Sequence, residues 1–149
     1  MHIRNGFDPV LSQFHKTHRF KGAVVVGLSA DEASEIFDLR ALLEPEILRG
    51  AVPQMTDATK QTAIIRCNDF SNSSDPLAWG GLNRIFHDTL YADSSQTFTR
   101  EVADKAMDRV DRYIRAVLLE GNGMQRAKSE HLAILEACLS GNADLAEDL

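Results

Sequence analysis

Cysteine is scarce in this chain and long hydrophobic runs are absent, and these two features exclude several classes of protein. The 149 residues include two cysteines, Cys67 and Cys138, whose spacing is not that of a metal or redox motif. We interpret them as reduced, structural thiols of a cytosolic protein. No apolar stretch approaches membrane-spanning length, and the N-terminus lacks the apolar core of a signal peptide. We therefore predict a cytoplasmic protein that does not associate with a membrane.

Proline and positive charge are also in short supply. The chain has four prolines, and 44% of its residues are hydrophobic, which is ordinary for a globular protein that forms one domain. The net charge is −6, but residues 1–22 hold four basic residues against one acidic residue, a balance of +3, so the remainder carries −9. An acidic body of this kind is a poor surface for nucleic-acid phosphates.

The chain consists of two segments of different character. Residues 1–28 are irregular apart from a valine-rich run bounded by glycines at 22–27, which predicts one short strand. Residues 29–149 show the apolar periodicity of helices throughout. Five or six amphipathic helices joined by short loops predict an all-α fold, an antiparallel bundle of about six helices.

Capping residues, prolines and glycines set the expected helix boundaries. Ser29 and Glu32 form a capping box at the start of the first helix, in which each side chain would satisfy a backbone donor. Pro53 should end that helix, and the second should run from residue 56 or 57 to about Cys67, before a polar loop. The remaining helices are expected to begin near residues 76, 95, 124 and 143.

Two histidines lie in apolar stripes on separate helices. His87 is part of Asn83-x-x-Phe86-His87-x-x-Leu90, and His131 is part of Glu130-His131-x-x-Ile134-Leu135. A histidine on a core-facing stripe needs a buried hydrogen-bond partner or a metal. Asn83 and His87 are four residues apart, so both project from one face of a helix and could supply two metal ligands. For each histidine taken alone, a hydrogen-bonded core residue is the simpler interpretation.

Arg40 is the third candidate, because it falls in the middle of an apolar stripe where arginine is rarely buried without a partner. One interpretation is an ion pair with a carboxylate. The other is a guanidinium that faces an internal cavity and binds a carboxylate or phosphate bidentately. The stripe alone favours the ion pair. No nucleophile elbow, phosphate-binding glycine loop or His-Glu-x-x-His motif is present in the sequence.

Three segments together resemble the effector-binding domain of GntR-type transcription regulators. They are Asp38-Leu39-Arg40-Ala41-Leu42-Leu43-Glu44-Pro45, the motif around His87, and Glu130-His131-x-x-Ile134-Leu135-x-Ala137 followed by Gly141-Asn142. The branch is the FadR-like one, whose all-helical C-terminal domain is called FCD, and the resemblance spans about residues 29–149. It implies a helical bundle around a cavity that binds a carboxylate-bearing metabolite. In many members of the family a divalent metal lies at the floor of that cavity.

The resemblance also implies a set of site residues. The family's metal ligands are an Asp and a His four residues apart, the His of the Glu-His motif, and a His on the helix that follows. His87 and His131 match the second and third of these, Asn83 stands at the aspartate position, and the last would fall beyond Leu149. The implied zinc, nickel or manganese at Asn83, His87 and His131 is therefore weakly held or absent. Arg40 matches an arginine that in this family often points into the effector cavity, beside the same three residues.

We therefore predict a ligand-sensing domain of a GntR-type regulator that binds a small carboxylate metabolite, forms a homodimer and is not an enzyme. Residues 20–26 resemble the last strand of a winged-helix wing, and residues 1–19 are too short for the helix-turn-helix that would precede it. Contact with DNA is accordingly expected only through a winged-helix domain that this chain lacks, as in a regulator shortened at both ends. The alternatives are a small metal-dependent enzyme, for which Glu130 is a poor general base, and a non-functional remnant.

Overall fold

A computed structural model describes residues 28–148, and every regular element in this part is helical. The expected strand at 22–27 lies outside the described residues. The described part contains six α-helices and one 3₁₀ turn, which confirms the all-α prediction and its number of helices. The elements are α2 (Ala30–Ala51), η1 (Val52–Gln54), α3 (Asp57–Asn72), α4 (Pro76–Tyr91), α5 (Thr97–Leu119), α6 (Gly123–Leu139) and α7 (Ala143–Asp148).

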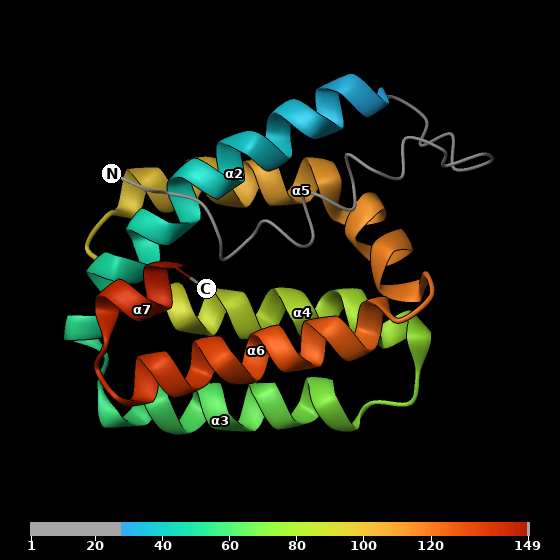
Figure 1. Ribbon diagram of the computed structural model, residues 1–149. Coiled ribbons are helices and arrows are strands. Elements are labelled where there is room, and N and C mark those ends of the chain that lie inside the picture. Colours follow the sequence, from blue (N-terminus) through green and yellow to red (C-terminus); the bar gives the residue numbers. More distant parts are fainter. Residues whose placement is uncertain (1–27, 149) are drawn as a thin grey trace.

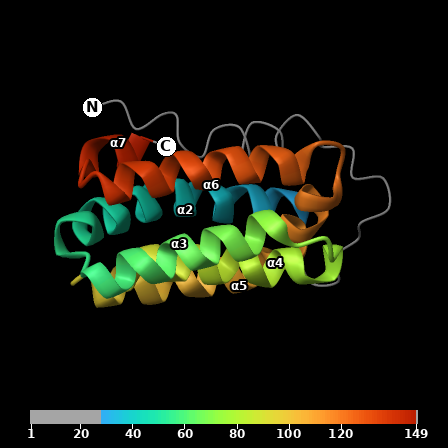
Figure 2. The ribbon, with the colours of Figure 1, turned by 90° about the horizontal axis from the view of Figure 1, so that it is seen from below.

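The five long helices run in alternating directions along the chain (Figure 1). Helix α2 packs along α5, while α3 packs against both α4 and α6, and the short α7 lies against α2 and α6. Seen from below, α3 and α6 lie in front of the other long helices (Figure 2). None of the helices in residues 28–148 is long and apolar enough to cross a membrane.

The start of α2 follows half of the predicted capping box. The Ser29 hydroxyl oxygen accepts a hydrogen bond from the backbone N–H of Glu32 at 3.1 Å. The Glu32 carboxylate, however, bonds to the Arg109 guanidinium of α5 rather than to the backbone of Ser29. This difference arises because α5 lies alongside α2 and brings a cation within reach, which the local sequence does not indicate.

The predicted end of α3 near Cys67 is wrong, because the helix continues to Asn72. Phe70 explains the extension, since its side chain is fully buried in the core and fixes the last turn of the helix. The backbone N–H of Ser73 then bonds to the carbonyl of Phe70 at 3.3 Å and closes the helix. Burial of one aromatic ring therefore outweighs the loop preference of the serine and asparagine beside it.

The other predicted boundaries agree closely with the structure. Thr56 caps α3, and Asp75 caps α4 directly before Pro76. Helix α2 ends at Ala51, and the 3₁₀ turn that contains Pro53 follows it. The Asn142 side chain accepts a hydrogen bond from the N–H of Leu145 and caps α7.

Both cysteines are buried and unbridged, as predicted for structural thiols. Burial raises the pKa of the Cys67 thiol and raises that of Cys138 to about 12. Since the thiolate is the reactive form, these two side chains act as small apolar core residues.

Candidate functional site

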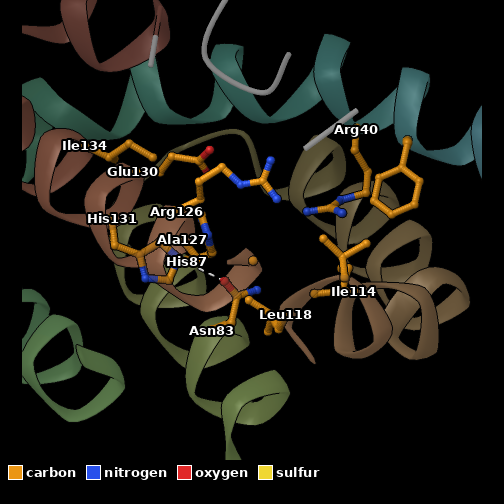
Figure 3. A pocket seen from close by; sticks show the side chains of 13 residues that line it. Arg40, Asn83, His87, Ile114, Leu118, Arg126, Ala127, Glu130, His131 and Ile134 are labelled. Carbon is orange, nitrogen blue, oxygen red and sulfur yellow. Dashed lines mark hydrogen bonds between the residues drawn. The ribbon is translucent and has the colours of Figure 1, made fainter. Parts of the chain in front are cut away.

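A partly open cavity of about 80 Å³ lies among α2, α4, α5 and α6. All four predicted site residues line it: Arg40 from α2, Asn83 and His87 from α4, and His131 from α6 (Figure 3). The structure therefore brings together residues that are up to 91 positions apart in the chain. The rest of the lining is mainly apolar and comes from Phe37, Ile114, Val117, Leu118, Gly123, Arg126, Ala127, Glu130 and Ile134.

Asn83 and His131 are directly linked within the cavity lining. His131 Nε2 and Asn83 Oδ1 are 2.9 Å apart and hydrogen-bonded (Figure 3). The His87 ring stands nearly perpendicular to that of His131, with 5.0 Å between the ring centroids. The helical spacing of four residues places Asn83 and His87 on the same face of α4, as predicted.

Two aromatic rings pack against His131. Its ring centroid lies 4.3 Å from that of Phe70 and 4.4 Å from that of Phe86. The side chain is 2% exposed, and its Nδ1 has no hydrogen-bond partner within the described residues. His131 thus has the packing of a hydrogen-bonded core histidine and lines the cavity at the same time.

Both histidines are neutral at physiological pH. Burial, and secondly the nearby Arg40 charge, lower the pKa of His87 to about 3. The pKa of His131 falls well below its ordinary value, mainly through burial and secondly through His87. Neither imidazole therefore supplies positive charge to the cavity, which leaves that task to arginine.

Arg40 forms the ion pair of the first interpretation and also lines the cavity that the second interpretation requires. Its guanidinium forms a bidentate ion pair with Glu44, with Nε–Oε1 at 2.9 Å and Nη2–Oε2 at 3.2 Å. Glu44 is 1% exposed and Arg40 is 7% exposed, so the pair is buried. Arg40 also packs over the Phe37 ring and lines the cavity, whereas Glu44 does not.

The model of the family described as "FCD domain" matches residues 35–149, most of the chain. The chain belongs to the FCD family. FCD domains are the C-terminal effector-binding domains of FadR-like GntR regulators, which confirms the predicted resemblance and makes this chain an effector-binding domain of a GntR-type regulator. No curated protein and no solved structure matches the chain.

Sequence reasoning missed two further charged residues of the FCD cavity, Arg126 and Glu130, one turn apart on α6. Glu130 lines the cavity although it lies about 100° around the helix from His131, because this wall spans a wide arc of α6. Burial raises the pKa of the Glu130 carboxyl, and the Arg126 charge opposes that shift. A charge on α6 is identified as a lining residue only once the packing of α2 and α5 around it is known.

Close packing shapes the corner between α5 and α6 beside the cavity. A Cβ atom on Gly123, the first residue of α6, would lie 2.0 Å from the Val117 carbonyl oxygen. The neighbouring atoms belong to backbone, so no side-chain movement could relieve the contact. Glycine at 123 therefore allows α6 to begin directly against the end of α5 and to present its first turn to the cavity.

The residues of this FCD cavity fit a divalent metal poorly. The donors are two imidazoles and one amide, and the amide oxygen of Asn83 is already bonded to His131 Nε2. Within residues 28–148, no group of three or more His, Cys, Asp or Glu side chains could hold a metal ion. The donor set has no carboxylate to offset the charge of the ion, and an amide oxygen is a weaker ligand than a carboxylate oxygen.

Proposed function

We propose that this FCD domain binds a small carboxylate-type metabolite in the cavity and that Arg40 binds its carboxylate. The observation that carries the proposal is the orientation of Arg40. Glu44 takes up the Nε–Nη2 edge of the guanidinium, and Arg40 has no other hydrogen bond in residues 28–148. The remaining edge of two terminal nitrogens offers a second planar fork, which suits a carboxylate.

The surroundings of Arg40 support the same chemistry. Phe37, Ile114 and Leu118 line the cavity beside it and restrict water, which strengthens a charge-assisted hydrogen bond. Asn83 and the neutral His87 add polar groups on the opposite wall, which could orient the rest of a ligand. An apolar cavity with a few convergent polar groups is the usual form of a small-molecule site.

Small carboxylic acids are expected to bind the chain through Arg40. A panel of small carboxylic acids should contain members that raise the unfolding temperature of the chain, because a ligand at about 100 times its Kd stabilises the native state by about 2.7 kcal/mol. Arg40→Lys keeps the positive charge but removes the fork, so we expect about tenfold weaker binding by isothermal titration calorimetry.

Arg66→Lys is the matched control, since Arg66 is a half-buried residue of α3 that pairs with Asp69 and lies outside the cavity lining. It should bind the same acid as the unmodified chain does. A panel in which no carboxylate stabilises the chain contradicts the proposal. Equal affinity in the Arg40→Lys variant would show that Arg40 does not bind the carboxylate.

We also propose that zinc, nickel or manganese is held weakly or not at all by Asn83, His87 and His131. Asn83→Asp would place a carboxylate beside the two imidazoles, so zinc affinity measured by competition with a chromophoric chelator should rise by about tenfold or more. Asn142→Asp makes the same change at an exposed helix cap away from the cavity and should leave zinc affinity unchanged. Zinc that stays bound at one equivalent in the unmodified chain after dialysis against a chelator would overturn this part.

We also propose that the chain forms a homodimer and that contact with DNA occurs only through a winged-helix domain. Both proposals rest on its membership of the FCD family. Sedimentation velocity tests the dimer directly. A single monomeric species at micromolar concentration would contradict it.

A further inference from the structure

Arg126 is a cavity residue to which the proposed function gives no role. It lies in the first two turns of α6 and lines the same cavity as Arg40, which reaches that cavity from α2. Its side chain is partly buried. The chain has a net charge of −6, yet two positively charged guanidinium groups line one small cavity, which indicates a site for an anion.

The two arginines differ in their partners. Glu44 binds one edge of Arg40, whereas Arg126 has no side-chain hydrogen bond or ion pair among residues 28–148. Glu130, one turn along α6, interacts with Arg126 electrostatically but is not within ion-pair distance. No side chain among residues 28–148 occupies the donors of Arg126, so they are available to a ligand.

The two guanidinium groups also converge. In Figure 3 the Arg126 side chain extends from α6 and the Arg40 side chain from the opposite wall, and both point toward the same space. Like charges that face one another across a space of limited water access repel. An anion between them removes this repulsion and gains charge-assisted hydrogen bonds from both sides.

The number of donors indicates how many acidic groups this anion has. One carboxylate has two oxygens and saturates one guanidinium fork. Arg40 offers its unpaired edge and Arg126 offers its guanidinium, so two carboxylates would give each arginine one bidentate partner. The cavity of about 80 Å³ restricts the spacer between the two carboxylates to a short chain.

We propose that Arg40 and Arg126 form a clamp for a short aliphatic dicarboxylate, with one carboxylate on each guanidinium. This inference rests on the proposed function, because it assumes that the cavity is the effector site. It adds a second binding residue and narrows the ligand from carboxylates in general to dicarboxylates. Glu130 opposes the second carboxylate and so limits the affinity.

Isothermal titration calorimetry on the full chain tests the clamp. The probes are oxalate, malonate, succinate and glutarate, each compared with the monocarboxylate of the same number of carbons. We expect the best dicarboxylate to bind at least about tenfold more tightly than its monocarboxylate counterpart. Arg126→Gln should abolish this preference, because it weakens dicarboxylate binding more than monocarboxylate binding.

Two further variants serve as controls. Arg112→Gln removes the same charge from an exposed position on α5 outside the cavity lining, and it should keep the dicarboxylate preference. Glu130→Gln removes the opposing carboxylate, and it should bind the dicarboxylate more tightly than the unmodified chain.

The outcomes separate the clamp from the function on which it rests. Monocarboxylate binding that depends on Arg40, with no preference for dicarboxylates, overturns the clamp and leaves the proposed function standing. Unchanged dicarboxylate affinity in the Arg126→Gln variant also overturns the clamp, as does tighter binding of inorganic phosphate than of every dicarboxylate. Failure of both classes of acid to bind overturns both proposals.

Discussion

Replacing Glu44 with alanine is expected to destabilise the fold by about 3–5 kcal/mol, because it leaves the buried Arg40 guanidinium without its partner. Glu44 is 1% exposed and supplies both oxygens of the ion pair. The lost carboxylate also leaves a space inside the core beside α2. Urea denaturation at neutral pH, monitored by the circular dichroism of the helices, measures the effect.

The double variant Arg40→Met/Glu44→Leu tests whether the unpaired charge or the lost packing causes this destabilisation. It removes both charges together and fills the space with apolar atoms of similar volume, so it should cost less stability than Glu44→Ala alone. Glu44→Gln should fall between the two, because the amide retains one acceptor for Arg40. If Glu44→Ala and the double variant are equally destabilised, the loss reflects packing, and the ion pair contributes little.

Local signals in the sequence determine where most of the helices begin. Ser29, Thr56, Asp75 and Asn142 cap the helices at the predicted positions, because a side-chain oxygen within three residues of an unpaired N–H acts through local geometry alone. The end of α3 was predicted wrongly because it depends on Phe70. Burial of that ring depends on helices distant in sequence, which no local signal encodes.

The site residues also fall into two groups, those that the sequence identifies and those that only the structure reveals. The spacing of Asn83 and His87 predicts a shared helix face, and an apolar stripe predicts that Arg40 points inward, so these residues could be chosen from the sequence. The Arg40–Glu44 pair has the i, i+4 spacing of a helical ion pair and could have been found too. Arg126 could not, because its role depends on where α6 lies relative to α2 and α5.

The neutrality of the two histidines connects the fold to the proposed chemistry. Both rings pack against aromatic side chains and are uncharged, so they contribute packing but no charge. The positive charge that an acidic ligand needs therefore comes from Arg40 and Arg126. A metal would have to compete with the hydrogen bond that already joins Asn83 to His131.

Acidification is expected to reduce stability before ordinary carboxylates titrate, because His87 and His131 resist protonation in the folded state. The pKa of His87 falls from 6.5 to about 3 on folding, while in the unfolded chain it returns to its ordinary value. Above the unfolded pKa both states are neutral and full stability is retained. As the pH falls from about 6.5 toward 3, only the unfolded state takes up the proton, so stability is lost throughout that window. At about pH 5 the loss from His87 alone is about 2 kcal/mol, and His131 acts in the same direction.

Urea titrations at a series of pH values between about 7.5 and 5, in buffer containing a chelator, measure this dependence. His87→Gln has no titrating group at that position, so its stability should change by about 2 kcal/mol less over the same range. The carboxylates are identical in both proteins and their contribution cancels in the comparison. Parallel curves for the two proteins would show that His87 titrates normally in the folded state, and that the Arg40 charge and the surrounding apolar wall do not control its protonation.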